Sequence, residues 1–212
     1  MKKILFVIMA LGLLIAAPAA AQNKALDKAL KKELAAKKKD FKKGGWEIFG
    51  TSRSLDVALL KHYQALEEGG DGVFEIIGYG QGKSKNILAT AAQNSAANRY
   101  AAEANARIKA QIKTTLEGNA NEVSEEVDKF SAIYLSKVEA EIKGQLKASF
   151  SIIRTNPQTG VSELQTYFIV NEATASRARQ AAYDAAVGES SLSADIANKA
   201  AAAIADRVVP AE

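Results

Sequence analysis

Cysteine is absent from this sequence. The chain therefore forms no disulfide, no thiolate metal site and no cysteine nucleophile. An acylated lipoprotein carries a cysteine at its processing site, whereas the corresponding position here is Gln22. We therefore expect the processed chain to be released as a soluble protein rather than anchored by lipid.

Histidine is almost absent. His62 is the only one, and it falls on the apolar face of a predicted helix, near Leu59 and Leu66. A single histidine cannot build a histidine metal cluster. We therefore expect His62 to lie at the edge of the hydrophobic core, and we predict no metal site.

Large aromatic residues are few and do not cluster along the chain. Trp46, Tyr79 and Tyr100 are scattered in the sequence and do not form an aromatic platform interleaved with basic residues. Proteins that bind single-stranded nucleic acid combine stacking aromatic side chains with a basic groove. We therefore predict that the chain binds no nucleic acid.

Long hydrophobic runs are absent except at the N-terminus. Two lysines precede an apolar run from Ile4 to Ala17, and three alanines come directly before Gln22. This order is typical of a secretory signal peptide, and the run is too short for a comfortable membrane span. We predict a signal peptide over residues 1–21, cleaved after Ala21, and a periplasmic or secreted protein.

Basic residues are concentrated in one segment. Residues 24–43 contain nine lysines and three acidic residues, whereas residues 44–212 have a small net negative charge. Leucines recur every four residues from Leu26 to Leu34, which predicts a basic helix over residues 22–44. Its lysines are suited to contact an anionic lipid surface or a cell-wall polymer, and the alternative is a solvated helix without a partner.

Prolines are rare and alanines are frequent, which favours a helix-rich domain. Apolar or small residues spaced three to four apart predict helices over residues 54–68, 84–117, 119–143 and 173–208, the last broken near Gly188.

The remaining segments read as strands. Residues 46–50 and 73–80 are predicted strands on either side of a helix, which favours a crossover unit with the two strands parallel. QLKASFSIIRT and VSELQTYFIVNE flank a turn that contains Pro157 and Gly160, a pattern typical of a hairpin. We predict one α+β domain over residues 45–208, with a sheet of about four strands and helices packed on one face.

The stretch VFEIIGYGQGKSKNILATAAQ is similar to a phosphate-binding loop, because a glycine-rich turn ends in Gly-Lys-Ser before a predicted helix. Such a loop has four residues between its first glycine and the Gly-Lys-Ser. That position is Ile77, and Gly78 makes the loop one residue short. We interpret the glycines as allowing a close approach between strand and helix. Nucleotide binding by the Gly78–Ser84 turn is kept as an alternative, and no cofactor is predicted.

Carboxylates occur in adjacent pairs, such as Glu67-Glu68 and Glu125-Glu126. Adjacent residues of a helix point about 100° apart, so neither pair forms an acid–base dyad. We therefore predict no catalytic residues. An envelope hydrolase with a carboxylate site that spacing does not reveal is a second alternative.

One segment supports a family resemblance. IIGYGQGKSKNILATAAQNSAANRYAAEANARIKAQI joins a strand ending in Gly-x-Gly to a long helix with regularly spaced alanines and Arg-Tyr-Ala and Asn-Ala-Arg elements. Over residues 73–187, including the hairpin and YFIV, the chain resembles small bacterial envelope proteins typified by the twenty-kilodalton Helicobacter membrane-associated lipoprotein. The resemblance implies an α+β envelope domain without established catalytic residues, although the acylated cysteine of that family is missing. We therefore predict an exported, non-enzymatic protein that binds or scaffolds other envelope components.

Overall fold

Two compact units, Met1–Gly44 and Gly45–Glu212, make up the chain in the computed structural model, which describes residues 19–115, 120–190 and 192–210. The first unit contains helix α1 (Ala19–Lys43), which ends directly before Gly44 and Gly45. The predicted cleavage site after Ala21 falls in the first turn of α1, and residues 1–18 of the predicted signal peptide lie outside the described residues. None of the helices in the described part of the chain has the combination of length and hydrophobicity that a bilayer span requires.

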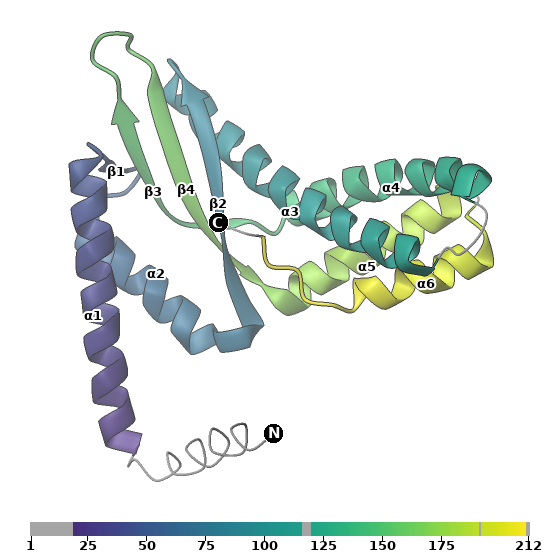
Figure 1. Cartoon of the computed structure of the whole chain (residues 1–212). Helices are drawn as coiled ribbons and strands as arrows, with labels where there is room; N and C mark the ends of the chain where they lie inside the picture. Colours follow the sequence, from purple (N-terminus) through teal and green to yellow (C-terminus); the bar gives the residue numbers. More distant parts are fainter. Residues whose placement is uncertain (1–18, 116–119, 191, 211–212) are drawn as a thin grey trace, which may run out of the picture. The chain divides into compact units, whose positions relative to one another are not determined.

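The second unit is built on a four-stranded antiparallel sheet (Figure 1). Its strands lie in the order β1 (Glu47–Phe49), β3 (Lys147–Thr155), β4 (Ser162–Asn171) and β2 (Val73–Gly82). β3 and β4 form the predicted hairpin. In its turn, the Asn156 side chain accepts the N–H of Gln158 at 2.9 Å, and Gly160 has a φ of +67°, which glycine adopts without strain. The predicted α+β class and the four-stranded sheet are confirmed.

The predicted parallel crossover between the first two strands is wrong. β1 and β2 lie at opposite edges of the sheet, and the β3–β4 hairpin lies between them. Every neighbouring pair is antiparallel, with β2 paired to β4 along its whole length and β1 paired to β3 over three residues. A strand–helix–strand order leads to a parallel pair only if the two strands become neighbours. In this sheet, β2 pairs with β4 of the later hairpin along its whole length, whereas β1 is only three residues long.

One face of the sheet is covered by α3 (Lys85–Thr115), which approaches β2 through small residues. A Cβ built on Gly78 would lie 2.0 Å from the Ala92 carbonyl oxygen, and one built on Gly80 would lie 2.4 Å from the Leu88 carbonyl oxygen. Ala92 and Leu88 are completely buried. The glycines therefore allow the backbones of strand and helix to approach closely, as the sequence predicted.

Helix α2 (Leu55–Gly69) contacts the opposite face of the sheet and is followed by a 3₁₀ turn (Gly70–Gly72). Ser54 is the N-cap of α2, and its side chain accepts the backbone N–H of Val57. His62 of α2 contacts Tyr167 of β4, which alternates with the residues that face α3. Helices therefore pack on one face of the sheet, as predicted, and α2 contacts the other face as well.

The C-terminal part of α3 extends past the sheet into a helical bundle (Figure 1). The other members of this bundle are α4 (Ala120–Lys143), α5 (Glu172–Ser190) and α6 (Ala194–Ile204). Phe130 and Tyr134 of α4 stack in its core with ring centroids 5.9 Å apart, and α5 contributes mainly alanines. Small side chains on α5 allow the bulky aromatic rings of α4 to be buried without enlarging the bundle.

Candidate functional site

The glycine-rich turn is used for packing. β2 continues to Gly82, and its residues Gly78 and Gly80 pair with β4 on one side and lie beneath α3 on their helix-facing side. A phosphate-binding loop instead wraps its backbone N–H groups around the phosphates. Lys83 follows the strand and is exposed. The turn therefore lacks the loop conformation that surrounds a phosphate.

His62 is buried in an aromatic pocket, and only 1% of its side chain is exposed. Its Nε2 shares a hydrogen bond with the Glu75 carboxylate of β2, and the rings of Tyr63, Phe150 and Tyr167 contact it edge-on. The predicted core position is confirmed, whereas its carboxylate partner was not predicted. Because these side chains enclose the His62 imidazole, it attaches α2 to the sheet and is not accessible to a substrate.

The adjacent carboxylate pairs are exposed on helix surfaces, at Glu67-Glu68 on α2 and at Glu125-Glu126 on α4. Neither pair lines the groove described below. Within the described ranges, no group of three or more histidine, cysteine, aspartate or glutamate side chains is arranged to hold a metal ion.

Arg179 of α5 is a buried charge that sequence reasoning missed. Its guanidinium is 1% exposed and donates to Glu172 Oε1 at 2.8 Å, to the Ile204 carbonyl oxygen at 3.2 Å and to the Tyr100 hydroxyl. Burial raises the pKa of Tyr100, although the nearby guanidinium opposes this shift. Burial lowers the pKa of Arg179, but its bonds to Glu172 and Tyr100 outweigh that effect and raise it. The network links α3, α5 and the end of α6, and we assign it to the bundle core.

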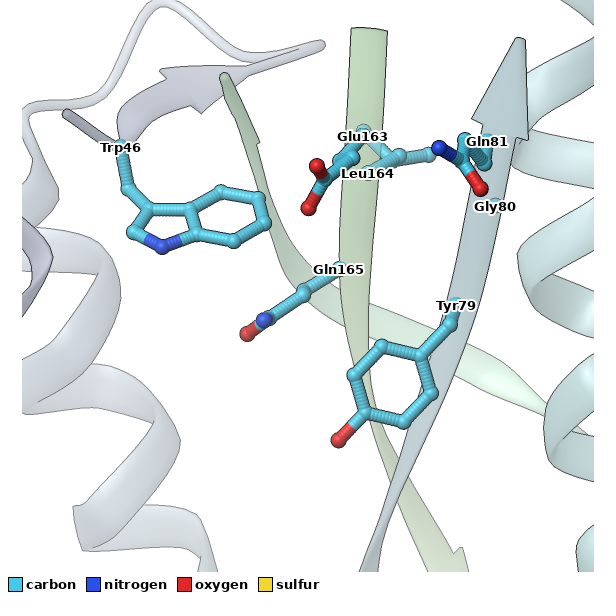
Figure 2. Close-up of a pocket in the computed structure, with 7 residues that line it drawn as sticks. All are labelled: Trp46, Tyr79, Gly80, Gln81, Glu163, Leu164 and Gln165. Atoms are coloured by element: carbon cyan, nitrogen blue, oxygen red, sulfur yellow. The ribbon is translucent and has the colours of Figure 1, made fainter. Parts of the chain in front are cut away.

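A groove lies on the sheet face opposite α3 (Figure 2). Trp46, which precedes β1, and Tyr79 of β2 flank it, and Glu163 and Gln165 of β4 point outward between these two rings. We call this site the sheet-face groove, and its lining residues are Trp46, Tyr79, Gly80, Gln81, Glu163, Leu164 and Gln165. Its volume of about 180 Å³ is below the roughly 300–1,000 Å³ typical of drug-sized ligand pockets, so it suits a group of about one ring.

Arg154 of β3 fixes one wall of the sheet-face groove. Its Nε and Nη2 donate to the same oxygen of Glu163, Oε2, at 3.0 and 2.6 Å. Its guanidinium carbon lies 4.6 Å from the centroid of the Trp46 ring, which is a cation–π contact. Arg154 therefore neutralises Glu163, the only carboxylate among the lining residues, and packs against one face of the Trp46 indole. Glu163 Oε1 takes no part in this ion pair and is available as a hydrogen-bond acceptor.

Tyr79 forms the other wall and is 47% exposed. The guanidinium carbon of Arg99, on α3, lies 5.7 Å from its ring centroid. Arg99 also donates to the Ile77 carbonyl oxygen of the edge strand at 2.8 Å. The same arginine thus binds the backbone of β2 and one side of the Tyr79 ring, which restricts the ring position.

The polar side chains of the groove are partly fixed as well. The Tyr167 hydroxyl donates to Gln165 Oε1 at 3.1 Å, which orients the amide and leaves its NH₂ group as a donor. The Trp46 indole N–H and the exposed Gln81 amide add further hydrogen-bonding groups. The sheet-face groove therefore combines two aromatic rings with both donors and acceptors.

The sequence predicts only part of the groove, namely which side chains share a face of the sheet. Gly78 and Gly80 alternate with Tyr79, so the tyrosine must point away from α3, and Glu163 and Gln165 alternate in the same way around the buried Leu164. That alternation assigns each side chain to a face. It does not bring Trp46 next to Tyr79, because their proximity depends on the order of all four strands. Of the three aromatic residues that are scattered in the sequence, only Tyr100 is remote from the groove, in the bundle core.

No family model matches the sequence, and no curated protein or solved structure is significantly similar to it. The resemblance to small bacterial envelope proteins is therefore still a prediction, and the functional argument rests on the geometry of the sheet-face groove.

Proposed function

We propose that the chain is an exported, non-enzymatic protein of the cell envelope that binds an envelope component in the sheet-face groove. The observation that supports it most is the placement of Trp46 and Tyr79 on one sheet face with Glu163 and Gln165 between them. Apolar rings with a few fixed polar groups are typical of ligand sites. The signal-peptide pattern of residues 1–21 supports export to the periplasm or the exterior.

Binding is favoured over hydrolysis by the ionisable groups of the groove. Glycoside hydrolysis generally uses two carboxyl groups on either side of the scissile bond. Glu163 is the only carboxylate among the lining residues, and Arg154 pairs with it at 2.6 Å. An envelope hydrolase would need a second acid or base within the groove, and its lining residues offer none. Nucleotide binding is disfavoured because Gly78 and Gly80 are used for packing.

Helix α1 supports a second, electrostatic contact with the envelope. It is a continuous helix in which Lys31, Lys32, Lys39, Lys42 and Lys43 are all exposed. Each lysine near an anionic membrane surface contributes about 1 kcal/mol, and salt screens such contacts within about 10 Å at 0.1 M. Anionic lipid headgroups or cell-wall polymers are therefore the proposed partners of α1.

Site-specific photo-crosslinking in intact cells tests the groove. The full-length chain carries a C-terminal tag and a photoreactive amino acid at Gln81, which is exposed in the groove, or at the control position Gln180, which is exposed on α5. We expect crosslinks to envelope material from position 81 only, and their loss when Trp46 and Tyr79 are both changed to Ala. Equal crosslinking from both positions would contradict binding in the groove.

The same purified protein tests export. N-terminal sequencing should begin at Gln22, and protein that starts at Met1 in the cytosol would contradict the proposed compartment. For α1, co-sedimentation with anionic vesicles at low and high salt should show binding that salt removes. The triple substitution of Lys31, Lys39 and Lys42 by Gln should reduce it, and unchanged pelleting would contradict the electrostatic contact.

A further inference from the structure

We propose that the ligand of the sheet-face groove is a neutral glycan, bound through a pyranose ring held against Trp46 and Tyr79. This inference rests on the proposed function, because it names the class of envelope component that the groove binds. It follows from three properties of the site: the partly exposed rings, the mixture of donors and acceptors, and the absence of unpaired charge on the lining residues.

The two aromatic rings are held so that each can stack on a ligand. Both are seen nearly face-on in Figure 2, on either side of Gln165. Arg154 lies 4.6 Å from the centroid of the Trp46 ring, and Arg99 lies 5.7 Å from that of Tyr79. Tyr79 is 47% exposed and Trp46 is partly exposed, so part of each ring is accessible to a ligand. The face of an aromatic ring is electronegative, and it attracts the polarised C–H groups on the apolar face of a sugar.

The polar groups suit hydroxyls, which donate and accept hydrogen bonds at the same atom. Glu163 Oε1 is an acceptor, the NH₂ group of Gln165 and the Trp46 N–H are donors, and the Gln81 amide is both. A hydroxyl-bearing ring can therefore satisfy each of these groups when water leaves the groove. Leaving such groups unpaired would weaken binding.

The charges at the groove disfavour ionic ligands. Glu163, the charged lining residue, is paired with Arg154, so the lining residues offer neither a cation for a phosphate or carboxylate nor an unneutralised anion for an amine. An ionic ligand would lose its hydration without gaining a partner of opposite charge. The ligand class that fits is polar and uncharged.

A proline-rich peptide is the main competitor, since such segments also dock against aromatic side chains. Proline has no N–H, so a proline segment supplies carbonyl acceptors but no donor. Glu163 Oε1 would then be covered without a hydrogen bond. The donor requirement at Glu163 favours the sugar over the peptide.

The experiment uses Trp46 as its own reporter, because it is the only tryptophan of the chain. The processed chain, purified after expression of the full sequence, is titrated with the neutral tetrasaccharides chitotetraose and cellotetraose, with a proline tetrapeptide and with inorganic phosphate. We expect a saturable fluorescence change with at least one tetrasaccharide, with a dissociation constant of about 1 mM, as is reasonable for a ligand held through one ring. The peptide and phosphate should cause no change.

Variants at Tyr79 identify the site of binding. Tyr79→Ala should weaken tetrasaccharide binding about tenfold, whereas Tyr79→Phe, which keeps the ring, should stay within about threefold of the parent. Gln81→Ala should also weaken binding, and the matched control Gln180→Ala on α5 should not. Circular dichroism spectra of all variants check folding, and Gln81→Ala tests the site independently if Tyr79→Ala fails to fold.

Three results would overturn the inference. The first is a tetrasaccharide response that Tyr79→Ala and Gln81→Ala leave unchanged. The second is a response to the proline peptide or phosphate without one to the sugars, and the third is an absence of response to any probe. If no probe causes a response, crosslinking from position 81 in cells would still support the sheet-face groove as a binding site for another ligand. If that crosslinking is absent too, the proposed function is rejected.

Discussion

The glycines of β2 provide a stringent test of how α3 packs on the sheet. Gly78, Gly80 and Gly82 lie on the same strand face, and none of them has the positive φ that only glycine tolerates well. Alanine can therefore adopt the backbone conformation of each position. The effect of the substitution depends on the space that is available for the added methyl group. The three positions differ greatly in that space.

The expected cost follows from the distances. A Cβ at Gly78 would lie 2.0 Å from the Ala92 carbonyl oxygen, one at Gly80 would lie 2.4 Å from the Leu88 carbonyl oxygen, and one at Gly82 would meet the Leu88 side chain at an ordinary 3.7 Å. Real Cβ contacts below 3.0 Å are essentially never observed, so Gly78→Ala requires α3 to move by about 1 Å and Gly80→Ala by somewhat more than half of that. The obstacle is helix backbone, which cannot rotate away as a side chain does.

We expect Gly78→Ala to destabilise the protein by about 3 kcal/mol and Gly80→Ala by about 1–3 kcal/mol, the range of overpacked cores. Gly82→Ala should be neutral or stabilising by up to about 1 kcal/mol, because alanine lowers the conformational entropy of the unfolded chain. Urea unfolding followed by circular dichroism measures these differences. With a slope of about 2 kcal/mol/M, Gly78→Ala should lower the midpoint by about 1.5 M at constant slope.

Gly82→Ala is the matched control for the series, because it adds the same methyl group on the same face of the same strand. The order of midpoints should be Gly82→Ala, then Gly80→Ala, then Gly78→Ala. A Gly78→Ala midpoint within about 0.2 M of the parent would refute the close packing of α3 on β2. It would also reopen a role for these glycines in a ligand-binding loop.

The remaining predictions concern the bundle core and the glycine-rich turn. The Tyr134 hydroxyl is buried without a hydrogen-bond partner among the described residues, so Tyr134→Phe should leave stability unchanged or raise it by about 1 kcal/mol. Tyr100→Phe should cost about 1.5–3 kcal/mol, because it removes the acceptor of a bond from the Arg179 guanidinium, and urea midpoints that place both variants together would contradict this assignment. Burial raises the pKa of both tyrosines above the unfolded value of about 10, so their contribution to stability is constant below about pH 10 and falls above it by up to about 1.4 kcal/mol per pH unit for each. Thermal unfolding at increasing alkaline pH measures this loss, which should be smaller in Tyr134→Phe. Lys83→Ala should change stability by less than about 0.5 kcal/mol, and ATP binding by calorimetry that this variant abolishes would contradict the packing role of the turn.

The sequence by itself determined the features that depend on neighbouring residues. The N-cap at Ser54, the glycine pair that follows α1, the hairpin turn at Gly160 and the small-residue face of α3 are present in the structure. Each of these features depends only on residues that are close together in the sequence. Periodicity of 3.6 or 2 residues reports which side of an element is buried, so the burial of His62 also followed from its place on the apolar face of a helix.

The tertiary structure alone decided which elements become neighbours. β1 and β2 look like a consecutive pair in the sequence, yet β2 gains a ladder along its whole length by pairing with β4, and the hairpin separates the two. Glu172 lies two turns before Arg179 on the same helix, but the other side-chain partner, Tyr100, is 79 residues away, so no local feature marks Arg179 as buried. The sheet-face groove has the same origin. Trp46 and Tyr79 reach one site only after hydrogen bonding between distant strands has fixed the order β1, β3, β4, β2, and pairing energy of that kind is a property of the whole sheet, which no single segment contains.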